Sequence, residues 1–154
     1  MAWLKGSKAK SIVIDDAGYL ITNQFMKNHS SKGQGNAIFG MYNDIADRFW
    51  SLIQYIISAL PSDVIVYVIM HEDVNEFGDI KPKTIGKLLD EKICLEGMFT
   101  IVLRCTIENN EHQFITQSDG GAVSKSPIGM FDKLEIDNDL KMVDETIRKY
   151  YFEE

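Results

Sequence analysis

The sequence predicts an α/β fold with a mainly parallel sheet, flanking helices and a C-terminal β-hairpin. Two short runs of branched apolar residues, at 11–16 and 64–70, are typical of buried strands in a parallel sheet. A long helical pattern separates these runs, and two strand candidates around a hairpin turn follow them. With 154 residues, the chain suits one compact domain over residues 1–154.

The first predicted strand covers residues 11–16 and reads SIVIDD. Its three consecutive branched apolar residues indicate burial on both faces, and Asp15 and Asp16 stand at its C-terminal end. A long amphipathic helix is then predicted over about 38–60, where Pro61 ends the pattern. The apolar face of this helix comprises Met41, Ile45, Phe49, Leu52, Ile53, Ile56 and Leu60.

The second predicted strand covers residues 64–70 and reads VIVYVIM. His71, Glu72 and Asp73 follow at its C-terminal end, and a polar loop is predicted over 75–83. A short helix then follows, with its apolar side made of Ile85, Leu88 and Leu89.

The last third of the chain predicts strands over 99–106 and 112–117. The Asn109–Asn110 pair between them suits a hairpin turn, because Asn tolerates positive φ. A terminal helix is predicted over 139–151, with Asp137 or Asn138 as its N-terminal cap. The apolar face of that helix comprises Leu140, Val143, Ile147 and Tyr150.

The net charge, the cysteine count and the lengths of the apolar runs argue against several classes of protein. The net charge is −7 and the pI about 4.9, which argues against a broad basic surface for duplex DNA. Cys94 and Cys105 make no disulfide framework and suit a reducing compartment. The sequence has no secretory signal and no apolar run long enough to span a membrane. We therefore expect a cytoplasmic protein without a membrane partner.

Asp15 and Asp16 are the first candidate site residues. An apolar strand that ends in two acids has the form of a Walker B segment. In such a segment the first acid, Asp15, holds the Mg²⁺ of a nucleotide through water, and the second, Asp16, orients the attacking water. The alternative is that the two acids simply end a strand at a turn, and the motif alone has low specificity.

Three further groups of polar residues have both a functional and a structural interpretation. His71 follows the second strand, where it can sense a γ-phosphate or be an ordinary loop residue. Lys81, Lys83 and Lys87 can contact a phosphate backbone or form a solvated face, and the last two can share one helix face. Lys125, in a loop rich in Gly and Ser, can reach a phosphate.

Several ordered blocks together resemble a known family. The chain from about residue 9 to residue 151 is similar to the C-terminal part of a phage-encoded RecA-like P-loop ATPase. That family is usually linked to DNA recombination or replication. The resemblance rests on the blocks SIVIDDAGYLITNQFM, IVYVIMHED, IKPKTIGKLLDEKICLEGMFTIVLR, SKSPIGMFD and DNDLKMVDETIRKYY.

This resemblance implies a role for each candidate residue. Asp15 would be the Mg²⁺-linked Walker B acid, Asp16 the adjacent catalytic acid, and His71 the residue at the sensor position. The segment 81–83 would lie in a mobile loop near the nucleic-acid side, and Lys125 near the nucleotide. In the RecA-like strand order, the P-loop strand would lie between the two strands predicted at 64–70 and 99–106.

The chain departs from this family in one respect. No G-x-x-x-x-G-K-[ST] motif occurs in the 154 residues, and the nearest fragments are GKL at 86–88 and GQG at 33–35. That loop supplies the backbone N–H cradle for the phosphates, the lysine and the Mg²⁺-binding hydroxyl. We therefore expect a truncated RecA-like core without ATP hydrolysis of its own. No cofactor is expected, and ATP with Mg²⁺ only if a separate P-loop chain completes the site.

Three functions are compatible with these observations. The first is a non-catalytic phage or mobile-element protein that binds a protein partner in the host cytoplasm, as an anti-CRISPR-like inhibitor of a defence nuclease. Its acidic charge suits a partner with a basic groove. The second is an ATPase fragment completed by a separate P-loop chain in phage recombination or replication. The third is a nucleic-acid-binding accessory protein that uses the lysine segment.

The missing P-loop strand also leads to a prediction about the sheet. Strands 64–70 and 99–106 would otherwise present unpaired edges, which are an aggregation hazard. We expect these two strands to pair directly in a four-stranded sheet, or a second copy of the chain to cover the open edge as a homodimer.

Overall fold

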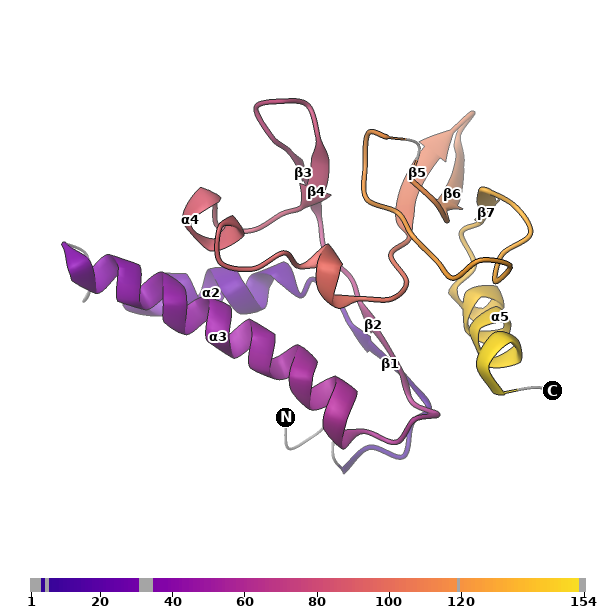
Figure 1. Ribbon diagram of the computed structural model, residues 1–154, viewed down its shortest axis with the longest axis horizontal. Helices are drawn as coiled ribbons and strands as arrows, with labels where there is room; N and C mark the ends of the chain where they lie inside the picture. Colours follow the sequence, from indigo (N-terminus) through magenta and orange to yellow (C-terminus); the bar gives the residue numbers. More distant parts are fainter. Residues whose placement is uncertain (1–3, 5, 31–34, 119, 153–154) are drawn as a thin grey trace. The chain divides into compact units, whose positions relative to one another are not determined.

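The computed structural model describes residues 4, 6–30, 35–118 and 120–152 (Figure 1). The chain divides into two compact units. The expectation of a single domain over residues 1–154 stays a prediction, because a division into compact units does not say whether each unit folds alone. The first unit comprises Met1–Glu72 and Pro82–Leu95, and the second comprises Asp73–Lys81 and Glu96–Glu154.

The sheet of the first unit consists of two parallel strands. β1 (Ser11–Ile14) pairs with β2 (Ile65–Val68), and Ile14 lies opposite Val68 (Figure 1). Both strands and their parallel direction agree with the sequence prediction. Burial of both faces is wrong for β1, because Ile12 is 7% exposed whereas its neighbour Val13 is 48% exposed. Successive strand residues point to opposite faces, so only one face of β1 is covered.

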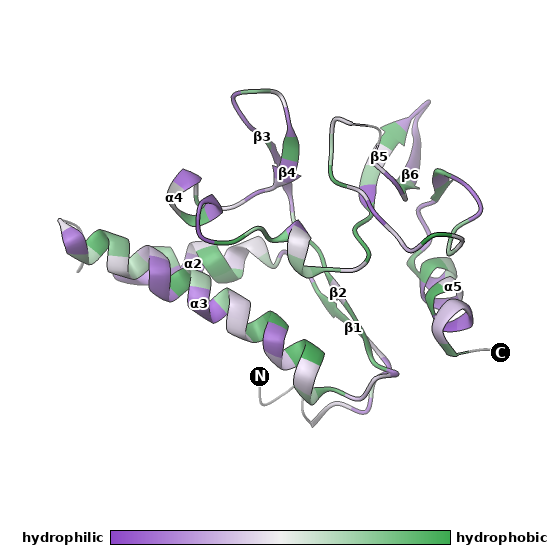
Figure 2. Cartoon of the chain, viewed as in Figure 1, coloured by the Kyte–Doolittle hydropathy of each residue, from purple (hydrophilic) through white to green (hydrophobic). Residues whose placement is uncertain are grey.

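Two helices follow β1 along the chain. The long helix predicted near 38–60 is α3 (Asn36–Ala59), and the sequence analysis missed α2 (Gly18–Asn28). No side chain caps the start of α2, so the usual sequence signal for a helix beginning is missing there. Figure 2 shows apolar and polar residues side by side along α3. The buried residues of α3 are Met41, Ile45, Ala46, Phe49 and Ile53.

The segment after β2 was predicted as a polar loop but forms a hairpin. β3 (Glu72–Val74) and β4 (Ile80–Pro82) make a two-stranded sheet. The short helix predicted around residues 85–89 is α4 (Lys87–Asp90). Lys83 precedes this helix, so the expectation that Lys83 and Lys87 share a helix face is wrong.

The sheet of the second unit is antiparallel, in the order β5-β6-β7. β5 (Arg104–Glu108) and β6 (Glu111–Ile115) are joined by Asn109 and Asn110, whose φ angles are 48° and 66°. Both residues therefore adopt the positive φ that the predicted hairpin turn requires. β7 (Glu135–Asp137) adds the third strand on the far side of β6.

The predicted pairing between strands 64–70 and 99–106 is wrong. β2 pairs with β1, and β5 pairs with β6 across a two-residue turn. A pairing across so short a turn closes a much smaller loop than a crossover between distant segments, so it costs less chain entropy. Among the described residues, the mainly parallel sheet is confirmed only for the pair β1–β2. A further short helix among the described residues is η1 (Glu96–Met98).

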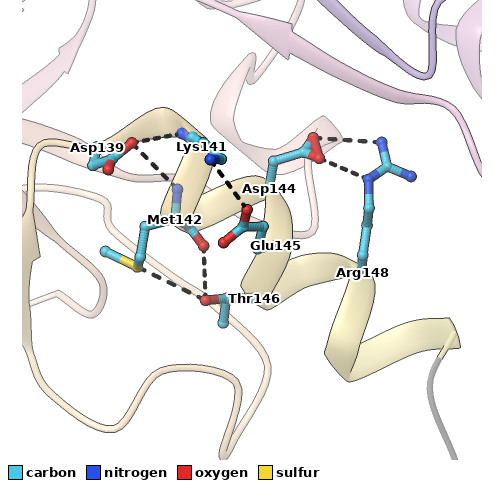
Figure 3. Close-up of polar contacts among 7 residues, drawn as sticks. All are labelled: Asp139, Lys141, Met142, Asp144, Glu145, Thr146 and Arg148. Atoms are coloured by element: carbon cyan, nitrogen blue, oxygen red, sulfur yellow. Dashed lines mark hydrogen bonds and ion pairs between the residues drawn. The ribbon is translucent and has the colours of Figure 1, made fainter.

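The terminal helix α5 (Leu140–Phe152) was predicted almost to its bounds. Val143 and Ile147, four residues apart, are 0% and 7% exposed and form its buried stripe. Asp144 and Arg148 are also four residues apart, with Arg148 Nε 2.7 Å from Asp144 Oδ2 (Figure 3).

The cap of α5 differs from the prediction. Asp139 Oδ1 accepts hydrogen bonds from the backbone N–H groups of Lys141, at 2.8 Å, and Met142, at 3.3 Å (Figure 3). Asp139 therefore caps the helix, rather than Asp137 or Asn138. Asp137 belongs to β7, and Asn138 instead donates from its side chain to the sulfur of Cys105 at 2.9 Å.

The cap assignment predicts a difference between two neighbouring acids. Asp139→Ala should lower the free energy of unfolding by about 0.5–2 kcal/mol, because two backbone N–H groups of α5 lose their acceptor. Asp137→Ala is the matched control and should change it by no more than about 0.5 kcal/mol. Urea unfolding followed by circular dichroism measures both. Equal losses in the two variants would show that Asp139 is not the cap.

Candidate functional site

The candidate site lies where β1 and β2 end, and backbone geometry brings its residues together. Because the strands are parallel and in register, their carboxyl ends meet at one edge of the sheet. Two further backbone hydrogen bonds extend the pairing past the strands. Ile69 N donates to Ile14 O at 3.0 Å, and Ala17 N donates to Ile69 O at 2.8 Å. In open α/β sheets this edge is where ligands bind.

At this edge the structure joins two residues that the sequence analysis had singled out separately. His71 Nε2 lies 3.0 Å from Asp16 Oδ1, and their side chains are 70% and 49% exposed. A pair this exposed contributes little to stability, since water screens its charges. Both groups therefore remain open to a ligand, and the imidazole is placed to hold the carboxylate in one orientation.

The two acids lie in a turn and not in the strand itself. β1 ends at Ile14, and Asp16 has a φ of 48°, in the left-handed region that few residues other than Gly, Asn and Asp adopt. Asp16 N donates to Asp15 Oδ1 at 3.1 Å, which supports this turn. The backbone oxygen of Asp16 accepts from Tyr19 N at 2.9 Å, at the start of α2. Sparsely populated conformations of this kind are concentrated at functional sites.

Two small residues, Ala17 and Gly18, follow the acids, and another backbone segment lies close to them. Ala17 is 1% exposed, and a Cβ atom built on Gly18 would lie 3.6 Å from the backbone oxygen of Lys83. Lys83 N in turn donates to His71 O at 2.7 Å. Lys83 is thus fixed by its backbone beside His71, a link that the sequence analysis did not foresee. In the sequence, the small residues Ala17 and Gly18 directly after Asp15 and Asp16 were the signal that could have indicated this close packing of backbone segments.

The other predicted contact residues belong to other elements of the chain. Lys87 begins α4 and is exposed, and Lys81 lies in β4 in the second unit. Lys125 also belongs to the second unit, where it exchanges two backbone hydrogen bonds with Val102, at 2.8 and 2.9 Å. The roles of Lys81, Lys87 and Lys125 toward nucleic acid or nucleotide stay predictions.

Two kinds of feature are absent from the described residues. In that part of the chain, no three His, Cys, Asp or Glu side chains are grouped so that they could hold a metal ion. No helix there combines the length and the apolar character that are needed to cross a membrane. Any Mg²⁺ ion bound by Asp15 would therefore need further oxygen ligands from elsewhere.

Comparison with known proteins identifies the family. A family model described as an AAA domain matches residues 5–128, which include both acids, His71 and Lys125. The predicted resemblance extended to residue 151, so most of the C-terminal segment, with β7 and α5, lies outside this match. No curated protein and no solved structure matches the chain. Since the match covers well over half of the sequence, the chain belongs to the AAA domain family of P-loop ATPase-like proteins.

Proposed function

We propose that this chain supplies the Walker B side of an ATP site, and that a P-loop segment outside these 154 residues completes that site. The observation that carries this proposal is the distance of 3.0 Å between His71 Nε2 and Asp16 Oδ1 at the carboxyl ends of β1 and β2. The resemblance of the sequence to phage RecA-like ATPases supports a role in phage DNA recombination or replication.

The residues at this edge fit a magnesium–nucleotide complex. Carboxylate oxygens are ligands that Mg²⁺ accepts, usually with several retained waters. Asp15 and Asp16 are both exposed, so their oxygens can be reached from solvent. Asp15 and Asp16 would be the residues of this chain that hold the ion, which would supply positive charge to neutralise the phosphates.

Each residue of the chain has a separate task in this proposal. Asp15 would hold the metal through water, from its position in the turn after β1. Asp16 accepts a hydrogen bond from the attacking water and orients it toward the γ-phosphate. His71 keeps the Asp16 carboxylate in place and can donate to a phosphate oxygen. Lys83 donates its backbone N–H to His71 O and so holds the His71 backbone in place.

The sheet offers a place for the completing strand. Among the described residues β1 is the one strand neighbour of β2, so the other edge of β2 is where a further strand could add. In the RecA-like order, the P-loop strand lies beside the strand that corresponds to β2. Addition of that strand would give main-chain hydrogen bonds along β2 and bring the phosphate cradle to the edge that carries Asp15 and Asp16.

This function is preferred to the two alternatives because a specific contact supports it. An inhibitor of a defence nuclease has no need of two acids and a histidine at the carboxyl edge of a parallel strand pair. The net charge of −7 suits a basic partner, but it does not distinguish one partner from another. The nucleic-acid accessory role rests on Lys81, Lys83 and Lys87, which do not share a helix face.

The first test concerns the chain by itself. Without the phosphate cradle, ATP with Mg²⁺ should bind no more tightly than about 1 mM, which corresponds to roughly −4 kcal/mol. Isothermal titration calorimetry measures this affinity directly. Micromolar binding by the 154-residue chain would contradict the proposal, because it would mean that these residues already hold the phosphates.

The second test restores the missing part. Addition of a polypeptide with the strand, P-loop and helix of a related ATPase should produce ATP turnover, and Asp16→Asn should reduce that turnover by about 10²–10⁴-fold. Asn tolerates positive φ as Asp does, so this change removes the charge and preserves the turn. Asp47→Asn, an exposed acid on α3, is the matched control. Turnover that both variants retain would overturn the role of Asp16.

The third test separates the positioning of Asp16 from nucleotide binding. In the completed enzyme, His71→Gln should lower kcat about tenfold or more while KM for ATP changes little, because a misplaced carboxylate slows chemistry more than binding. Steady-state kinetics over a range of ATP concentrations distinguish the two effects. An unchanged kcat would remove His71 from the site.

A further inference from the structure

Lys83 lies at the carboxyl edge of the strand pair and is fixed there by its backbone. Its N–H donates to His71 O at 2.7 Å, in the segment that follows β2. A Cβ atom built on Gly18, in the segment that follows β1, would lie 3.6 Å from its carbonyl oxygen. The main chain of Lys83 is therefore close to the residues that follow both strands, and His71 in turn contacts Asp16.

The segment that carries Lys83 is held on both sides of this residue. Pro82 precedes it and restricts its own φ to about −65°. Thr84 follows it, and the Thr84 hydroxyl donates to the Asp90 carboxylate at the end of α4. Leu89 of the same short helix is 0% exposed, and α4 contacts α3. The Lys83 backbone is thus positioned in advance, so a contact made by its side chain does not have to order the chain first.

The ammonium group of Lys83 is available to a ligand. The side chain is exposed, and within the part of the chain that the structure describes it makes no hydrogen bond or ion pair. Lys10, in the same unit, is instead paired with Asp63. Exposed lysines are common on protein surfaces, so the position of Lys83, rather than its exposure, carries the inference.

The charges at this edge give a cation there a task. A nucleotide triphosphate is strongly negative, and Asp15 and Asp16 add two negative charges where its phosphates would lie. His71 contributes a positive charge only when it is protonated. Lys83 carries a permanent compact charge of the kind that binds phosphate, and its backbone contacts keep it at this edge.

We propose that the Lys83 ammonium binds the terminal phosphate of the nucleotide and so makes the completed site prefer ATP to ADP. This inference rests on the proposed function, because a P-loop segment must first hold the nucleotide. The terminal phosphate is the relevant one, since Asp16 orients water toward it and His71 links Asp16 to Lys83. Lys83 is thereby assigned to the nucleotide, whereas the family resemblance implied a place near nucleic acid.

Calorimetry on the chain bound to the P-loop polypeptide tests this assignment. The ligands are ADP and adenylyl imidodiphosphate, a non-hydrolysable ATP analogue, each with Mg²⁺. Lys83→Met should weaken binding of the analogue by about tenfold or more and binding of ADP by less than about twofold. Lys83→Arg preserves the charge and should retain most of the affinity for the analogue. Lys92→Met, at an exposed lysine of the same segment, is the matched control and should bind both ligands as the wild type does.

The outcomes separate this inference from the proposed function. A wild-type complex that binds neither nucleotide overturns both. If Asp16→Asn abolishes ATP turnover but Lys83→Met binds both ligands as the wild type does, the proposed function stands and the role of Lys83 is overturned. Equal weakening of ADP and the analogue also overturns it, as does loss of single-stranded oligonucleotide binding, measured by fluorescence anisotropy, with unchanged nucleotide affinities. The Lys83 variants should fold, because the contacts at this position use main-chain atoms, and circular dichroism checks this.

Discussion

The in-register parallel pairing of β1 with β2 is the interaction on which the candidate site depends. Backbone hydrogen bonds continue past the strands, from Ile69 to Ile14 and from Ala17 to Ile69, so the two chain segments stay together through the turn. If β2 slipped by one residue along β1, His71 would be displaced relative to Asp16 and every side chain of β2 would change face. The contact between those two residues is therefore a consequence of main-chain geometry, which makes it robust to changes at the surface.

The turn after β1 determines where the two acids lie. Asp16 adopts a positive φ, which costs conformational energy in most residues and is tolerated by Asp. Buried Ala17 anchors the turn, and the Asp16 oxygen accepts a hydrogen bond at the start of α2. The acids are thereby presented to solvent at the carboxyl edge of the strand pair, while the helix that follows them packs on α3. Membership of the AAA domain family agrees with the proposal that this edge forms one side of a nucleotide site.

The helices and strands of this chain differ in how well they could be predicted from the sequence. α3 and α5 carry a strong period of apolar residues, and the β5–β6 turn carries two consecutive Asn residues, so local sequence was sufficient. α2 was missed because it begins without a capping side chain directly after the acids. The predicted direct pairing of the strands at 64–70 and 99–106 was wrong. It was inferred from the absence of a P-loop strand between them and not from a feature of the two segments themselves. No local signal specifies which partner a strand will find.

The sequence by itself determined the apolar strands, the long helix, the hairpin turn, and the presence of Asp15, Asp16 and His71 at strand ends. These are short-range properties, set by side-chain periodicity and by the φ preferences of single residues. Only the tertiary structure decided that His71 meets Asp16, that Lys83 binds the backbone of His71, and that Asp139 caps α5. The first two contacts join segments that are 12 or more residues apart, and the third depends on where the helix begins to within one residue. Hydrogen-bond geometry in the folded chain settles such questions, and residue types alone do not.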